Sequence, residues 1–227
     1  MRTAFGVVSN MKFYVSIVVI IMTVFVHVVS AQSKVPDKPS WVDGGITAVI
    51  YQKTFDEALA EISRSNHIPI GLQITNREEP DGCKQPVGFN LSKVTLAEAL
   101  NSLIARCPVY SWSIQDRVVN VVPSVAEDSL LDVRLPKLAV EKITVDEIVD
   151  SIFKSSAISS AMRLRNVKRD DWVAYPRSPR STHTYSLTFT DRSFRSILNS
   201  LLTETDNKYW ILFNVSTDKG WIVLNVF

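Results

Sequence analysis

Apolar residues recur every three or four positions in four segments, which begin at Thr54, Thr95, Thr144 and Ser193. This spacing places the apolar side chains on one face of an amphipathic helix. The predicted buried faces are Phe55, Ala58, Leu59 and Ile62; Leu96, Leu100, Leu103 and Ile104; Val145, Ile148, Val149 and Ile152; and Phe194, Ile197, Leu198, Leu201 and Leu202. The sequence therefore predicts four helices that each bury one face.

Each predicted helix begins at a residue that can satisfy free backbone N–H groups. Three of them open with a capping box, in which a Thr hydroxyl and a Glu carboxylate bond the first turn. The pairs are Thr54 with Glu57, Thr95 with Glu98 and Thr144 with Glu147, while Ser193 is a plain cap.

Short runs that alternate or are rich in β-branched residues flank the helices and predict strands. In the first half they cover 46–52, 68–74, 87–92, 110–116 and 118–122. In the second half they cover 131–136, 161–167, 184–190, 209–215 and 221–227. Both halves therefore have the order strand, helix, strand, strand, helix, strand, strand.

The two halves also share residues, which indicates an internal repeat. Segment 54–68 resembles 144–158, segment 89–112 resembles 187–210, and segment 118–122 resembles 223–227. The distance between matching segments grows along the chain, so the second copy carries insertions, one before Tyr185 and one in the final hairpin.

One pentapeptide of the repeat reads ALNSL over 99–103 and ILNSL over 197–201. In the first copy Asn101 and Ser102 lie between the apolar positions Leu100 and Leu103. We therefore interpret the polar pair as the solvated flank of an amphipathic helix. The pentapeptide then serves mainly to pack the helix against the core and is not a functional site.

The N-terminal segment 1–31 has the pattern of a secretory signal. Basic residues precede an apolar run over 15–29, and small residues lead to Ala31. We expect cleavage near Ala31, followed by a linker over 32–45. The alternative is an uncleaved membrane anchor, because the apolar run approaches the length of a tilted span.

Charge and motifs narrow the function classes. The chain holds 25 Lys and Arg against 23 Asp and Glu, and the predicted signal accounts for the excess, so we expect no nucleic-acid partner. No phosphate-binding Gly loop, HExxH or GxSxG motif is present. Outside the signal the histidines are His67, after a predicted helix end, and His183, which has no predicted acidic partner. We expect no catalytic site, metal or cofactor.

The two cysteines, Cys83 and Cys107, both lie in the part of the chain that the signal would export. An oxidising compartment favours their pairing, which would stabilise the fold by ~3 kcal/mol. There is no CxxC and no His at ligand spacing, so a structural disulfide is favoured over a redox or metal site.

The segment GFNLSKVTLAEALNSLIARCPVYSWSIQDRVVNVVP resembles the short N-terminal domain of secretins and TonB-dependent transducers, the STN or secretin N0 domain. The resemblance covers about 46–124 and extends more loosely over 131–227. It implies an α+β fold of two tandem βαββαββ domains, each with two helices on short mixed sheets. The predicted boundaries are 46–125 and 131–227, with an insertion over 166–183.

The resemblance also implies a function. Domains of this family lie in the periplasm and dock onto other envelope proteins of secretion or TonB systems, with an outer-membrane pore or transporter in the same chain. Here no barrel follows the second copy before Phe227. We therefore expect a periplasmic adaptor or sensor that binds an envelope protein; the alternatives are a self-assembling scaffold, hence a homo-oligomer, and a small hydrolase.

The insertion supplies the first candidate binding residues, because Arg and aromatic side chains dominate interface hot spots. They are Arg169, Trp172, Tyr175, Arg177 and Arg180. The alternative is a surface loop that folds back on its own domain. A second route to binding is an exposed strand edge, with which an extended peptide can pair.

Overall fold

A computed structural model describes residues 39–75, 81–125, 129–169, 182–215 and 221–227. The predicted signal lies outside these ranges. Residues Pro39–Phe227 form one compact unit. In the described ranges, no helix has the length and apolar character needed to cross a membrane.

Both halves of the chain contain helices and strands. The first half contains η1 (Ser40–Val42), β1 (Ile46–Lys53), α2 (Phe55–Asn66), β2 (Ile70–Thr75), α3 (Asp81–Lys84), β3 (Val87–Val94), α4 (Leu96–Ile104), β4 (Tyr110–Gln115) and β5 (Val118–Pro123). The second half contains η2 (Leu130–Asp132), β6 (Arg134–Ile143), α5 (Val145–Lys154), α6 (Ser156–Leu164), β7 (Lys168–Arg169), β8 (Tyr185–Ser193), α7 (Phe194–Glu204), β9 (Tyr209–Val215) and β10 (Trp221–Val226). The fold is mixed α+β, as the sequence predicts.

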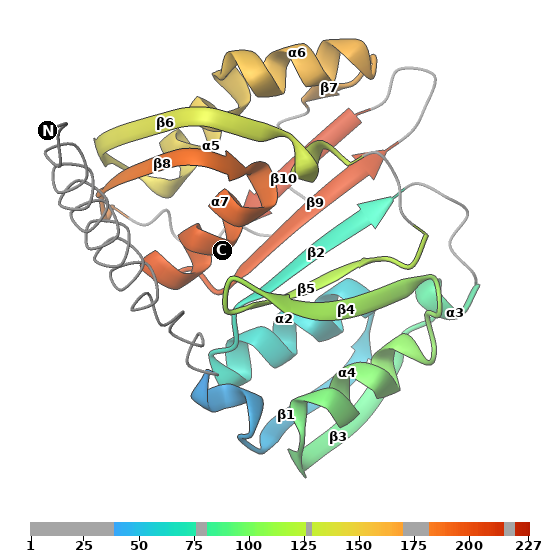
Figure 1. Ribbon diagram of the computed structural model, residues 1–227. Coiled ribbons are helices and arrows are strands. Elements are labelled where there is room, and N and C mark those ends of the chain that lie inside the picture. The colour runs from blue at the N-terminus through green and yellow to red at the C-terminus, as the bar shows by residue number, and fades with distance from the viewer. Residues whose placement is uncertain (1–38, 76–80, 126–128, 170–181, 216–220) are drawn as a thin grey trace, which may run out of the picture. The chain divides into compact units, whose positions relative to one another are not determined.

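A six-stranded sheet in the order β4-β5-β2-β9-β10-β7 forms the middle of this unit. Figure 1 shows α2 and α4 on one face of this sheet and α5 and α7 on the other. Two antiparallel pairs, β1 with β3 and β6 with β8, complete the outer layers. Each half therefore contributes its helices to a different face of one shared sheet.

The two halves join where β2 pairs with β9. The strands run parallel, in a register from Ile70 opposite Tyr209 to Thr75 opposite Asn214. In the repeat β9 is the counterpart of β4, since 187–210 matches 89–112. The joint therefore pairs unlike edges, a β2 edge of the first copy with a β4-type edge of the second.

Strand β9 is buried on both faces and serves both hydrophobic cores. Tyr209 and Ile211 belong to the core under α2 and α4, while Trp210 and Leu212 belong to the core under α5 and α7. In the opposite direction, Val118 of β5 is part of the second core. The boundary predicted between 46–125 and 131–227 thus divides the sequence repeat, but the cores extend across it.

The structure confirms the predicted helix starts. All three capping boxes are present, and the Oγ of Ser193 accepts a hydrogen bond from the N–H of Ser196. The bond from the N–H of Thr95 lowers the pKa of the Glu98 carboxyl, and Thr144 does the same for Glu147. The predicted apolar faces are buried, except that Ile104 is only partly buried.

The strand predicted over 161–167 is wrong, because α6 occupies most of this range. The Ser155 side chain accepts a bond from the N–H of Ile158 and starts a new helix directly after α5. Ile158, Ala161 and Met162 then form its buried face, at helical rather than alternating spacing. The strand predicted over 131–136 also begins late, since η2 precedes β6.

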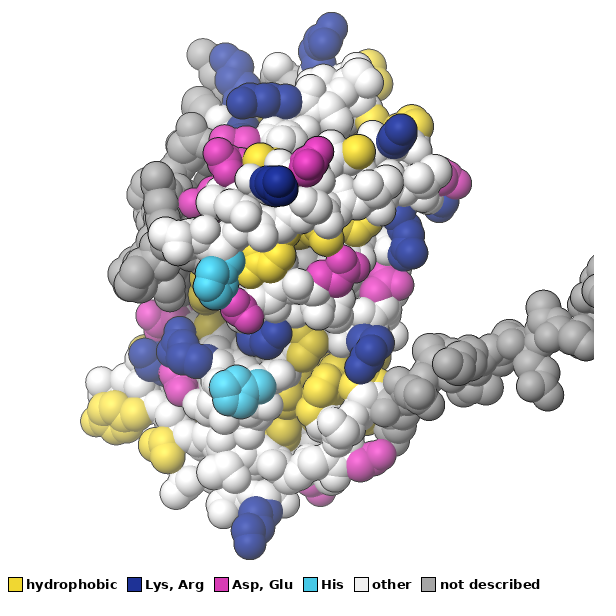
Figure 2. Space-filling view, turned by 90° about the vertical axis from the view of Figure 1, so that its left-hand side faces the viewer, with side chains coloured by type: hydrophobic (Ala, Val, Ile, Leu, Met, Phe, Trp, Pro, Cys, Tyr) yellow, Lys and Arg dark blue, Asp and Glu magenta, His cyan; other side chains and the backbone are white. Residues whose placement is uncertain are grey.

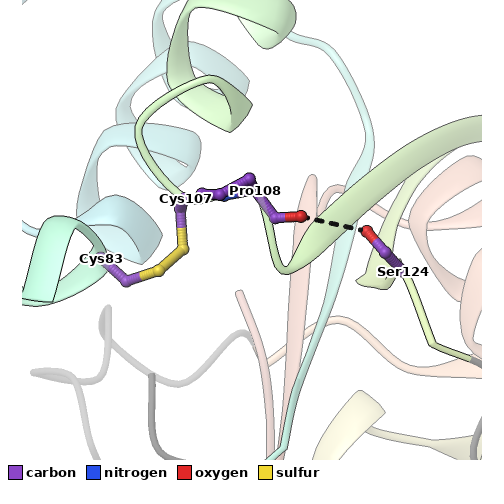
Figure 3. Close-up of a disulfide and its surroundings, with 4 residues drawn as sticks. All are labelled: Cys83, Cys107, Pro108 and Ser124. Atoms are coloured by element: carbon purple, nitrogen blue, oxygen red, sulfur yellow. Dashed lines mark hydrogen bonds between the residues drawn. A yellow bond between two sulfur atoms is a disulfide. The ribbon is translucent and has the colours of Figure 1, made fainter. Parts of the chain in front are cut away.

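The structure confirms the disulfide between Cys83 and Cys107, with the two Cα atoms 4.8 Å apart. Figure 3 shows that it links α3 to the turn that leads from α4 into β4. The same turn is tied to the end of β5, because the N–H of Ser124 donates to the carbonyl oxygen of Val109 at 2.7 Å. The Ser124 hydroxyl adds a longer bond to the carbonyl of Pro108, at 3.5 Å. The crosslink therefore fixes the start of β4.

Candidate protein-binding site

The repeated Asn of the LNSL pentapeptide binds a Trp indole in both copies. The Nε1–H of Trp112 donates to Oδ1 of Asn101 at 2.9 Å, and that of Trp210 donates to Oδ1 of Asn199 at 3.1 Å. Asn101 and Ser102 are exposed, as the interpretation as a solvated flank predicted, but Asn199 in the second copy is buried. In both copies a Trp eleven residues later reaches the Asn from the next strand, a contact that the interpretation missed. The sequence did contain a clue to this contact, because the two Trp residues occupy matching positions of the repeat.

In the second copy this pair is buried inside the joint. Trp210 and Asn199 are both fully buried, and Nδ2 of Asn199 donates to the carbonyl oxygen of Gln115 at 3.3 Å. The indole of Trp210 lies across the backbone of Gly71, its direct neighbour on β2. The Trp–Asn pair of the second copy therefore packs its indole against the adjacent strand β2.

In the first copy the same pair lies at the end of the sheet. On the described residues, β4 pairs with β5 on one side only, and it is the terminal strand of the sheet order. Asn101 is exposed and Trp112 is partly buried against the first core. Residues 111–115 of this strand, which we call the β4 edge, therefore include the Trp of this pair and have β5 on one side and no described strand on the other.

A second set of contacts distinguishes the covered strand from the β4 edge. Arg195 of α7 donates to Oε1 of Gln73 in β2 at 3.1 Å and lies 3.6 Å from a carboxylate oxygen of Asp132. Burial lowers the pKa of this guanidinium, while Asp132 raises it. The repeat places Ala97 at the corresponding position of the first copy, so the polar tie to a neighbouring strand is missing at the β4 edge.

The predicted binding residues of the insertion are not assembled in the described ranges. Arg169 lies against its own half, with its guanidinium 2.6 Å from a carboxylate oxygen of Asp150 and 4.7 Å from the centroid of the Phe153 ring. The four other predicted residues lie outside the described ranges: Trp172, Tyr175, Arg177 and Arg180. Arg169 thus packs against its own half, and the binding role of the five residues stays a prediction.

The structure gives His183 an acidic partner that the sequence did not predict. Its Nδ1 lies 3.0 Å from a carboxylate oxygen of Asp206. The two side chains are 69% and 80% exposed, so water surrounds a pair that catalysis would need in a dry site. His67 is the left-handed cap of α2, as its place after the helix end predicted.

Surface charge gives no further candidate on the face seen in Figure 2. Basic and acidic side chains are interspersed there, without a continuous patch of one sign. Among the residues with described placement, no group of three or more His, Cys, Asp or Glu is arranged to hold a metal ion. The β4 edge is therefore the candidate that the structure favours.

No protein-family model matches the chain, and the search of the curated proteins found no match.

Proposed function

We propose that this protein is an exported interaction module of the cell envelope, which binds a partner protein through the β4 edge. The observation that carries the proposal is the Trp112–Asn101 pair, because the indole of its buried counterpart packs against the neighbouring strand β2 in the joint. An exposed strand edge pairs readily with an extended segment of another protein. The activity proposed is binding, as an adaptor or sensor.

The proposed compartment is the periplasm, reached through the predicted signal over 1–31. The Cys83–Cys107 disulfide is consistent with an oxidising compartment. The resemblance of the repeat to the short N-terminal domain of secretins and TonB transducers supports the same compartment. Both halves contain helices and strands, with α3 in the first half and α6 in the second beyond the order that the sequence predicts. We therefore propose a partner among the envelope proteins that secretion or TonB systems use.

Photo-crosslinking in cells tests this proposal. Benzoylphenylalanine in place of Ser113 puts the reactive group on the β4 edge, and the same residue in place of the exposed Glu204 of α7 is the matched control. We expect Ser113, but not Glu204, to capture an envelope protein that mass spectrometry identifies. The same product from both positions, or none from Ser113, would reject the β4 edge as the binding site.

A second candidate function, a self-assembling scaffold, is favoured by the asymmetry of the joint. If two identical strand edges paired, the association would end with two copies. A joint between two different kinds of edge instead leaves one edge of each kind at the ends of the sheet, where further copies could pair. On the described residues the ends of the sheet are β4 and β7, which belong to the two complementary kinds. Light scattering of the purified protein separates the candidates: concentration-dependent growth supports the scaffold, and a monomer supports the adaptor.

A further inference from the structure

We propose that the β4 edge binds an extended protein segment that runs parallel to β4 and places a glycine opposite Trp112. The inference rests on the proposed function, because it names the class of ligand that the same edge would take. Its template is the joint, where β2 occupies the corresponding place beside β9.

The direction of the bound segment follows from the strand pairings. Strands β4 and β9 both pair antiparallel with the next strand of their hairpin, β5 and β10. On its other side β9 accepts β2 in the parallel direction. A segment in the same place on β4 therefore runs parallel to β4.

The glycine follows from the indole. A Cβ atom on Gly71 would lie less than 3.0 Å from three atoms of the Trp210 indole, a distance that real side chains do not adopt. The same hydrogen bond to an Asn of the preceding helix, across the same sequence separation, orients Trp112 and Trp210 alike. Trp112, whose partner on the β5 side is Val121, would therefore extend over the residue that a bound segment places opposite it on the other side, and only glycine leaves room for the ring there.

A second position of the segment is also specified. Two residues after Gly71, Gln73 is bonded by Arg195, but the first copy has Ala97 in place of that arginine. The neighbouring side chain on β4 is Ile114, which is 39% exposed. An unpaired polar group there would lose hydration without gaining a partner. The segment therefore carries an apolar residue two positions after its glycine.

The occupant is a segment of another protein rather than the protein's own β2. Strand β2 carries the glycine, but β5 and β9 pair with its two edges inside the folded chain. The ligand class is thus an extended strand with the pattern glycine, any residue, apolar residue.

Peptide binding to the folded full-length mature protein tests the pattern. The probe is a fluorescent peptide with the sequence of 68–75 carrying Gln73→Leu, flanked by lysines for solubility. The matched peptide carries Gly71→Val in addition. We expect the glycine peptide to bind about tenfold more tightly or better, which is a difference of about 1.4 kcal/mol. Equal dissociation constants would overturn the inference.

A variant of the protein tests whether the Trp112 indole causes the preference for the glycine peptide. In Trp112→Ala the preference for glycine should fall below about threefold, because the ring no longer limits the space. If this variant unfolds, Asn101→Ala releases the same ring from its hydrogen bond and gives a second reading. A paramagnetic label on the N-terminus of the peptide should broaden the amide signal of Ser111 more than that of Gln115; the reverse would reject the parallel direction.

The two proposals fail separately. If the crosslinker at Ser113 captures an envelope protein while the two peptides bind equally, the glycine rule falls and the proposed function stands. If Ser113 captures nothing and neither peptide binds, the proposed function itself falls.

Discussion

The indole of Trp210 lies directly over the backbone of Gly71, so that the side chain of one half fills the place where the other half lacks one. The contact lies between strands that are far apart in the sequence and belong to different copies of the repeat. It defines how closely the two halves approach, and its consequences can be measured.

Gly71→Ala should lower the free energy of unfolding by about 2 kcal/mol or more, because the added methyl group would overlap the indole. Gly88→Ala in β3 is the matched control, since its Cβ would meet nothing nearer than the Ile50 carbonyl oxygen at 3.7 Å. Urea unfolding of both variants checks this. Equal effects would show that the approach of Trp210 does not limit the joint.

Asn199→Ala should cost about 2 kcal/mol, since it leaves the buried indole N–H of Trp210 without its acceptor. Asn101→Ala removes the equivalent bond at an exposed site, where water can replace it, and should cost less than about 1 kcal/mol. The comparison uses the same substitution at matching positions of the repeat. A larger loss at position 101 would contradict the assigned burial.

Removal of the disulfide, with Cys83→Ser and Cys107→Ser together, should lower the free energy of unfolding by ~3 to 4 kcal/mol. The bond closes a loop with a sequence separation of 24 and fixes the start of β4. Reductant should have the same effect on the native chain and none on the double variant. A native protein whose unfolding is insensitive to reductant would refute the crosslink.

Stability should fall at alkaline pH because of Tyr209. Burial, together with the charges of Asp56 and Tyr110, raises the pKa of its phenol well above 10.0. In the unfolded chain the group ionises near pH 10, so above this pH unfolding releases a proton and becomes more favourable. Below pH 10 the phenol is protonated in both the folded and the unfolded chain, so Tyr209 causes no loss of stability there.

Tyr209→Phe should reduce this alkaline loss, which unfolding free energies at pH 8 and pH 11 would measure. The lost bond from the phenol to the carbonyl oxygen of Asp56 affects stability at both pH values and cancels in the difference. Tyr51→Phe, at a side chain that is 72% exposed, should leave the wild-type loss intact. An identical pH profile for all three proteins would contradict the role of Tyr209.

Arg169→Ala should lower the melting temperature, since it removes the ion pair with Asp150 and the contact with Phe153, together worth about 1 kcal/mol. The double variant Trp172→Ala with Arg177→Ala should instead weaken partner capture and leave the melting temperature unchanged. Calorimetry and crosslinking on the same proteins separate the two effects. Capture lost in Arg169→Ala without any loss of stability would restore that residue to a binding surface.

The sequence predicted the parts of the fold that depend on local physics. Capping boxes such as Thr144 with Glu147 and the apolar stripe of α7 involve residues only a few positions apart, so their spacing specifies them. It failed at α6, where a short run of mixed residues fits either period until the Ser155 cap is recognised.

The candidate site was predicted only in kind, as an exposed strand edge. Helical spacing separates apolar from polar positions, but it does not show that Trp112 and Trp210 reach back to a polar one. Nor does the sequence show that β2 meets β9, because that pairing depends on contacts between residues that are far apart in the chain. The matching Trp and Asn residues of the repeat were the only sequence clue to this contact, and the burial of Trp210 and Asn199 showed what the contact does.

The exchange of Tyr209, Ile211 and Val118 between the cores has a consequence for the order of events when the chain folds. A chain that is synthesised or translocated from its N-terminus presents α2 and α4 long before the strand that completes their core. The first half therefore lacks part of its core until β9 emerges, and we expect both halves to form together in one cooperative transition. If the chain is exported as proposed, we expect this dependence of an early segment on a late one to keep the first half from folding before it has passed through a narrow channel.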